Sequence, residues 1–241
     1  MLRALGTATR VGWRPSGLYR LPTEAGTVPY RIVRANPVTG GGRNDRRPAL
    51  VIGLHGFGSD ERQVETMLAL DLPAPVVYLA PRGGFEEGAG FSWFELAVAA
   101  DEKPAPVAGA VGEALVRLRA FARAAQTAWD TDPSWVALVG YSQGGALALA
   151  AAARAGEPFT AVATLSGGTQ EPGPPRVPLF VGYGTLDPLI PAETVRRRLA
   201  TWTSADVTAS EARAPHVVTA RQRSDLGVWL RERLEVRPRS V

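Results

Sequence analysis

Five short apolar runs, almost free of polar residues, mark the middle of this chain. Each has five or six residues and is rich in Val, Leu and Ala. Apolar side chains at every position, instead of at alternate positions, are typical of parallel strands covered on both faces. The predicted strands are Ala49–Leu54, Val76–Ala80, Trp135–Val139, Ala161–Leu165 and Leu179–Tyr183.

Segments with helical periodicity alternate with these runs. From Val107 to Trp129, apolar residues recur every three or four positions, which predicts a helix with one buried face. Further helices are predicted over Ala192–Trp202 and Thr219–Leu234, an antiparallel strand over Thr27–Val33, and a short strand over Val207–Ser210. This alternation of strands and helices predicts an α/β fold with a mostly parallel central sheet and helices on both faces.

The length predicts one domain. A chain of 241 residues, 45% of them hydrophobic, can bury a substantial core. We expect residues 1–26 to form an N-terminal extension and residues 236–241 a frayed tail. Gly40–Gly42 predicts a flexible turn, and Pro81–Pro106, rich in glycine and aromatic residues, predicts an irregular loop.

Composition excludes several classes of partner and site. The chain has no cysteine, which rules out disulfides, a cysteine nucleophile and thiolate metal sites. Its net charge of +4 comes from scattered arginines whose densest cluster, Arg196–Arg198, is interpreted as solvated surface instead of a nucleic-acid site. No apolar run approaches the length of a membrane span, and the first residues are too polar for a signal peptide. We therefore expect no membrane insertion and a cytoplasmic location.

The strongest chemical motif is Gly140-Tyr141-Ser142-Gln143-Gly144. Such a pattern would arise by chance in about one shuffled sequence in nine, so its context decides its meaning. Here a predicted strand precedes it and an Ala-rich, helix-forming segment follows it. In a strand–turn–helix this tight, only glycine fits two residues on either side of a serine with an exposed hydroxyl. The motif therefore predicts a nucleophile elbow at Ser142.

A serine nucleophile needs a base, and the base needs an acid to orient it. Of the two histidines, only His216 follows Ser142 in the order Ser, acid, His that is typical of α/β-hydrolases. Asp187 stands between them, directly after the strand predicted to end at Tyr183. The carboxyl ends of parallel strands carry the active residues in such sheets. We therefore predict His216 as the base and Asp187 as the acid.

An oxyanion formed during acyl transfer needs two backbone N–H donors. One should come from Gln143, next to the nucleophile, and the other from Phe57, in the glycine-containing loop after Leu54. His55 is then interpreted as a residue that organises this loop. Trp93 either lines an acyl pocket, as a candidate substrate-binding residue, or anchors its own loop, and the sequence leaves both open.

These motifs together resemble the carboxylesterase/phospholipase family of α/β-hydrolases, which includes acyl-protein thioesterases and small bacterial esterases. The resemblance spans roughly residues 49–218 and is more specific than any one motif. It implies an α/β-hydrolase fold and a serine hydrolase that cleaves carboxylic esters or thioesters without a cofactor, through Ser142, Asp187 and His216. No metal site is expected, because one of the two histidines is needed as the base. The matching segments are Leu54–Gly58, Leu79–Gly83, Trp93–Glu95, Gly140–Gly145, Gly184–Asp187 and His216.

The chain also departs from the family pattern. Pro215 stands where a glycine usually precedes the histidine, Glu95 stands where Trp-Phe is usually followed by Asp, and the N-terminal region is longer. A peptidase, a cofactor-free perhydrolase and a non-catalytic binding protein remain alternatives on the same residues. Because no amphipathic lid helix is predicted within Pro81–Pro106, we expect small, soluble esters as substrates.

Overall fold

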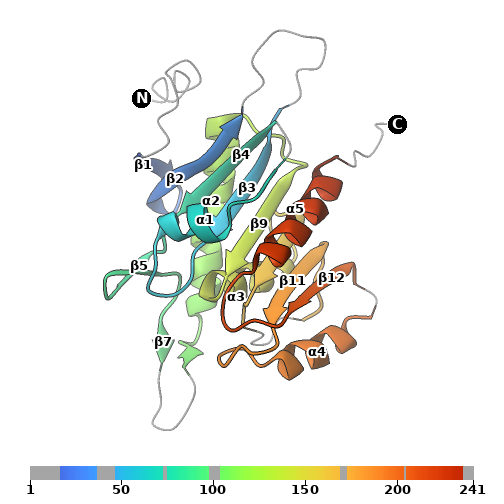
Figure 1. Cartoon of the computed structure of the whole chain (residues 1–241). Coiled ribbons are helices and arrows are strands. Elements are labelled where there is room, and N and C mark those ends of the chain that lie inside the picture. Colours follow the sequence, from blue (N-terminus) through green and yellow to red (C-terminus); the bar gives the residue numbers. More distant parts are fainter. Residues whose placement is uncertain are drawn as a thin grey trace.

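The computed structural model describes residues 17–36, 47–72, 75–97, 104–168, 173–203 and 205–235. Eight strands form one sheet in the order β1-β2-β4-β3-β9-β10-β11-β12 (Figure 1). From β4 to β12 every neighbouring pair is parallel, while β1 and β2 pair antiparallel at one edge. The strands are β1 (Leu18–Thr23), β2 (Gly26–Asn36), β3 (Ala49–Leu54), β4 (Val76–Pro81), β9 (Val136–Tyr141), β10 (Ala161–Leu165), β11 (Leu179–Gly184) and β12 (Val207–Ala212). The predicted mostly parallel sheet is confirmed.

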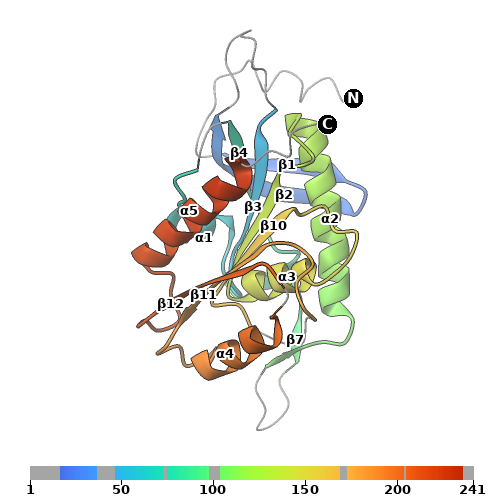
Figure 2. The same cartoon turned by 90° about the vertical axis from the view of Figure 1, so that its right-hand side faces the viewer.

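Helices cover both faces of this sheet (Figure 2). One layer contains α2 (Ala110–Trp129), α3 (Gln143–Ala152) and α4 (Ala192–Thr201), and the other contains α1 (Glu61–Met67) and α5 (Ala220–Glu235).

Strand β3 shows why the predicted runs are apolar throughout. Leu50 and Ile52 belong to the core under α2 and α3, whereas Ala49 and Val51 belong to the core under α1 and α5. Successive side chains of a strand point to opposite faces, so a strand between two helical layers buries every position.

The structure corrects the sequence interpretation near the N-terminus. Leu18–Thr23, inside the predicted extension, forms the edge strand β1 and pairs antiparallel with β2. Helix α1 was not predicted. It has seven residues, begins after the N-cap Asp60, whose carboxylate accepts the Arg62 N–H, and buries only Glu61 and Val64. So short a helix offers too few apolar positions for its period to be recognised.

The predicted irregular loop is also ordered into short strands where it is described. Strand β5 (Phe85–Glu87) pairs with β6 (Gly90–Ser92), and β7 (Leu96–Ala97) pairs with β8 (Ala105–Pro106). The guanidinium of Arg82 lies 4.3 Å from the centre of the Phe91 ring, a cation–π contact that holds the first hairpin. Gly40–Gly42 and the tail 236–241 lie outside the described residues.

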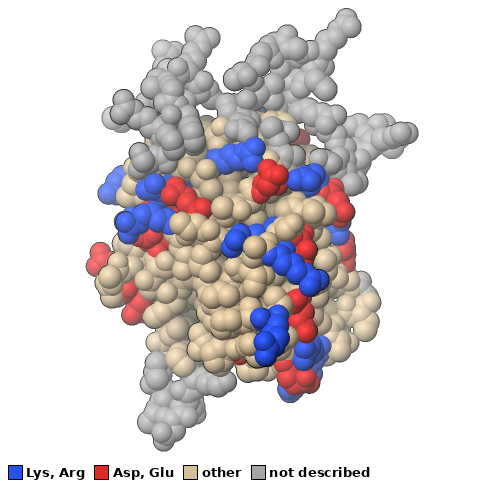
Figure 3. Space-filling model, in the orientation of Figure 1, with Lys and Arg blue, Asp and Glu red and all other residues tan. Residues whose placement is uncertain are grey.

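Charges of both signs are interspersed on the face seen in Figure 3. Two arginines of the predicted cluster have different surroundings in the structure. Arg196 forms an ion pair with Glu211 at 2.8 Å, and Arg198 lines a small cavity. Among the described helices, none combines the length and the hydrophobicity needed to cross a bilayer.

Candidate active site

Ser142 occupies the turn between β9 and α3, in the strained conformation expected of a nucleophile elbow. Its backbone has φ 52° and ψ −115°, which is uncommon for a residue with a side chain. A Cβ added to Gly140 would collide with the carbonyl oxygen of Gly144, and one added to Gly144 would collide with that of His55. The Ser142 N–H donates to the Leu165 carbonyl at 3.0 Å. Two glycines and a neighbouring strand thus define the turn.

Three predicted side chains meet at this turn in one hydrogen-bonded chain. His216 Nε2 lies 2.9 Å from Ser142 Oγ, and His216 Nδ1 lies 2.7 Å from Asp187 Oδ2. Asp187 Oδ1 accepts the N–H groups of Leu189 and Ile190, each at 2.9 Å. A carboxylate bonded in this way keeps the proton on Nδ1, which leaves the lone pair of Nε2 facing the serine. The side chain of Asp187 is 1% exposed and that of His216 is 17% exposed.

Adjacent strands bring Asp187 and His216 together. Asp187 follows β11, and His216 lies in the segment between β12 and α5. The Leu186 N–H donates to the Ala214 carbonyl at 3.1 Å, so the two loops are joined directly. Pro215, where a glycine is usual, lies in a tight turn whose carbonyl accepts the Val217 N–H at 2.8 Å. The departure is therefore accommodated next to the histidine.

Tyr141 contributes a contact that the sequence did not reveal. Its hydroxyl donates to the backbone carbonyl of His216 at 2.8 Å, and the two ring centres are 5.3 Å apart. Burial, with the nearby Asp187 carboxylate, raises the pKa of Tyr141, so the hydroxyl stays a donor. The residue before Ser142 thereby holds the loop that carries His216.

The two predicted oxyanion donors lie on segments that border Ser142. Gln143 is the first residue of α3, where backbone N–H groups precede the helical hydrogen-bond ladder. Phe57 follows Gly56, and a Cβ built on Gly56 would lie 3.3 Å from the Ser142 Cβ. Phe57 is 44% exposed. These positions suit the predicted donors, whose role stays a prediction.

His55 and Trp93 form a buried cluster behind the Gly56–Phe57 loop. His55 Nε2 accepts the Gly83 N–H at 2.9 Å, which leaves Nδ1 to donate to the Gly56 carbonyl at 2.8 Å. Burial lowers the pKa of His55 and keeps its ring neutral. Trp93 Nε1 donates to the His55 carbonyl at 2.8 Å, and the Trp93 residue is 6% exposed. Of the two roles left open for Trp93, these contacts support the anchor, and the lining of an acyl pocket stays a prediction.

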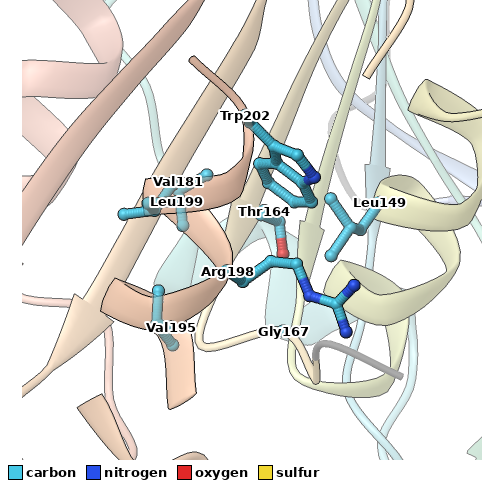
Figure 4. A pocket seen from close by; sticks show the side chains of 8 residues that line it. All are labelled: Leu149, Thr164, Gly167, Val181, Val195, Arg198, Leu199 and Trp202. Atoms are coloured by element: carbon cyan, nitrogen blue, oxygen red, sulfur yellow. The ribbon is translucent and has the colours of Figure 1, made fainter. Parts of the chain in front are cut away.

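A small cavity lies apart from these residues, between α4, α3 and the strands β10 and β11 (Figure 4). Its space of about 10 Å³ is near the lower limit for one water molecule. The Thr164 hydroxyl lies there without a hydrogen-bond partner among the described residues, which suits a single water. The lining residues are Leu149, Thr164, Gly167, Val181, Val195, Arg198, Leu199 and Trp202. No group of three or more His, Asp or Glu in the described part of the chain could hold a metal ion.

Comparison with known proteins finds a family that matches most of the chain. The family described as Phospholipase/Carboxylesterase matches residues 42–208. A protein named "Putative esterase NocK" from Nocardia uniformis subsp. tsuyamanensis is 31% identical over 149 residues, a match that covers 59% of this chain. The match covers 41% of that relative, so the chain spans about two fifths of its length.

Solved structures show the same α/β-hydrolase fold. A carboxylesterase from Bacillus cereus superposes with a TM-score of 0.69 at 17% identity, over 85% of this chain and 94% of its own. A carboxylesterase from Mesorhizobium loti superposes with a TM-score of 0.69 at 20% identity, over 90% and 99% of the two chains. SOBER1 from Arabidopsis thaliana gives 0.61 at 22% identity, over 78% of this chain and 100% of its own.

Proposed function

Since the chain belongs to the phospholipase/carboxylesterase family, we propose that it is a serine hydrolase that cleaves carboxylic esters of small molecules through Ser142, His216 and Asp187. The observation that carries this proposal is the chain of hydrogen bonds from the Ser142 hydroxyl through both His216 nitrogens to the Asp187 carboxylate. The proposed nucleophile lies within hydrogen-bond distance of the proposed base, and the base lies within hydrogen-bond distance of the acid that orients it.

In the proposed acylation step, His216 Nε2 accepts the hydroxyl proton as Ser142 Oγ bonds to the ester carbonyl carbon. The carbonyl oxygen takes up the electron pair and becomes an oxyanion, while Asp187 stabilises the charged imidazole. When the oxyanion collapses, the bond to the leaving alcohol breaks and His216 gives the alcohol its proton. Ser142 is left carrying the acyl group as an ester.

Deacylation repeats the same sequence with water. His216 accepts a proton from a water molecule, whose oxygen attacks the acyl carbon. The second oxyanion collapses with release of the carboxylic acid, and the proton on His216 returns to Ser142 Oγ. In both steps the backbone N–H groups of Phe57 and Gln143 are the proposed donors to the oxyanion, which exists only near the transition state.

Covalent labelling tests this proposal directly. A fluorophosphonate should phosphonylate Ser142, because only an activated hydroxyl attacks such an electrophile at a useful rate. Peptide mapping locates the adduct, and Ser142→Ala should abolish both labelling and esterase activity. Labelling of another serine while Ser142 stays free would overturn the assignment.

A substrate panel tests the bond that is cleaved. We propose turnover of p-nitrophenyl esters of short and medium chains, with thioesters as a second group, and we expect aminoacyl anilides to be cleaved poorly. The insertion after β4 supports a preference for small, soluble substrates, because its described part forms the short β5–β6 and β7–β8 pairs and contains no amphipathic helix that could serve as a lid. Faster cleavage of anilides than of esters would favour a peptidase.

A further inference from the structure

We propose that the Gln143 side chain and Trp93 are positioning residues that fix the two oxyanion donors relative to each other. This inference rests on the proposed function, in which the donors are the backbone N–H groups of Gln143 and Phe57. The two donors belong to different segments, one at the start of α3 and the other after β3. Without a connection between these segments, their separation would vary with the motion of each loop.

Gln143 provides the first connection through its side chain. Its Oε1 accepts the backbone N–H of Trp93 at 2.9 Å, and its Nε2 donates to the Phe94 carbonyl at 2.7 Å. An amide is suited to this place, because it accepts one bond and donates another, whereas an ionised carboxylate only accepts. The residue is 7% exposed, so water does not compete freely for these bonds.

Trp93 provides the second connection. The same residue whose backbone bonds to Gln143 sends its indole N–H to the His55 carbonyl at 2.8 Å. The Trp93 and His55 ring centres are 4.8 Å apart, so the rings also pack together. Trp93 thus joins the start of α3, through its backbone N–H, to the residue that follows β3, through its indole N–H.

The loop that carries Phe57 is held on further sides. His55 Nδ1 donates to the Gly56 carbonyl at 2.8 Å, and the Gly56 N–H donates to Gln63 Oε1 at 2.7 Å. The path from one donor to the other therefore runs from the Gln143 amide to Trp93, then to His55, and along two peptide units to Phe57. The path therefore links the side chain of Gln143, whose own N–H is one proposed donor, to the backbone that carries the Phe57 donor.

This path predicts a defect that appears in the transition state. Oxyanion donors act when they lie 2.7–3.1 Å from the charged oxygen, so a small displacement weakens the contact. Such a contact forms only near the transition state, and its loss lowers kcat with little change in KM. Removal of one whole donor costs about 100-fold to 1000-fold in kcat in a known serine protease, so a displaced donor should cost less.

Trp93→Phe is the primary test, because it keeps an aromatic ring and removes only the indole N–H and one ring of the side chain. Trp229→Phe is the matched control. Trp229, in α5 on the opposite face of the sheet, is also buried, but its Nε1 has no hydrogen-bond partner in the described structure. Its ring packs on that of Phe180 in β11. We expect about a 10-fold to 100-fold lower kcat for Trp93→Phe on p-nitrophenyl acetate, with KM within about twofold, and wild-type kinetics for Trp229→Phe.

A second variant and a second readout separate positioning from stability. Gln143→Glu keeps the size and the acceptor of the side chain but replaces the donor to Phe94, and it should also lower kcat. A trifluoromethyl ketone, which forms an anionic adduct on serine, should lose affinity in proportion to the loss in kcat/KM. Urea unfolding shows which variants are folded under the assay conditions, and only these variants are compared.

The outcomes are distinguishable from failure of the proposed function. If the wild-type protein neither cleaves esters nor labels at Ser142, the proposed function is wrong. If the wild-type protein is active and both folded variants keep their kcat, or lose activity through KM alone, the positioning role is wrong. Equal losses in Trp93→Phe and Trp229→Phe would also overturn it.

Discussion

The two sides of Ser142 are built in different ways, and the two histidines of this chain mark the difference. His55, on the side of the proposed oxyanion donors, is fully buried, and both of its ring nitrogens bond to backbone groups. His216, on the other side, is partly exposed, and both of its nitrogens bond to side chains of the candidate site. The same residue type thus belongs to a fixed framework in one place and to reactive groups in the other.

The comparison shows how environment selects a role. A buried ring that is fully hydrogen bonded and neutral holds a loop in place and has no free lone pair for chemistry. A proposed base must instead gain and lose a proton, which requires an acceptor that faces the reacting hydroxyl and a carboxylate behind it. Leu186 and Val217, next in sequence to Asp187 and His216, are both exposed, whereas His55 on the other side is fully buried.

Asp187→Asn should give the largest effect. A small effect would contradict the assignment of the His216 side as the reactive side of Ser142. An amide can favour the wrong tautomer of His216 and removes the negative charge behind it, so kcat should fall about 10⁴-fold, a magnitude carried over from the serine-protease example. The measurement is steady-state kinetics on p-nitrophenyl acetate. Asp206→Asn is the control, since this carboxylate pairs with Arg233 outside the site. A variant with most of its kcat would point to another acid.

Tyr141→Phe should give a moderate effect on the same side. The change keeps the ring next to His216 and removes one hydrogen bond to the His216 carbonyl, a bond worth about 0.5–1.5 kcal/mol. We expect kcat to fall about 2-fold to 10-fold, with a shifted pH profile of kcat/KM.

Tyr78→Phe is the control for this variant. Its hydroxyl also donates to a backbone carbonyl, that of Leu68, in a fully buried place. It should lower stability and leave kcat and the pH profile unchanged. Identical kinetic behaviour of the two variants would remove the special role of Tyr141.

The pH dependence of stability tests the side of Ser142 that contains His55, called the framework side here because His55 bonds only to backbone groups. Burial lowers the pKa of His55, while Glu61 and Asp60 oppose this shift and Arg82 assists it. As the pH falls below the ordinary histidine value of about 6.5, the unfolded chain takes up a proton that folded His55 refuses. The free energy of unfolding should therefore decrease as the pH falls, by at most about 1.4 kcal/mol per pH unit. Above about pH 6.5, the stabilisation that neutral His55 provides should be fully present.

Urea unfolding between pH 7.5 and pH 5 measures this dependence. His55→Gln should show a shallower decrease than the wild-type protein, because glutamine does not titrate. His216→Gln should keep most of the slope that His55 causes. Equal slopes for the wild-type protein and His55→Gln would show that His55 is not held neutral by the fold.

The smallest expected effect concerns the physical state of the substrate. The described part of the insertion on the framework side, held by contacts such as that of Arg82 with Phe91, offers no helical lid that could open at a lipid surface. The rate should therefore follow the concentration of dissolved ester and show no jump as a triglyceride of short chains passes its solubility limit. A sharp rise on the emulsion would show that part of this framework moves.

The sequence by itself determined the parallel strands of the sheet and the residues that meet at their carboxyl ends. Strand β3 begins and ends where the apolar run Ala49–Leu54 does, because burial on both faces demands apolar side chains at each position. The glycines around Ser142 indicated the tight turn, and the chain order of Asp187 and His216 indicated which groups would reach it. The structure does bring these three side chains within hydrogen-bond distance.

Only the tertiary structure decided the roles of Trp93, Tyr141 and the Gln143 side chain. Each bonds to a backbone group far away in the sequence, namely the carbonyls of His55, His216 and Phe94. Backbone carbonyls are present in every residue, so no spacing or residue type in the sequence marks which one a buried side chain will reach. That choice depends on how separate loops pack against each other, and packing is settled only when the whole sheet and its helices are assembled.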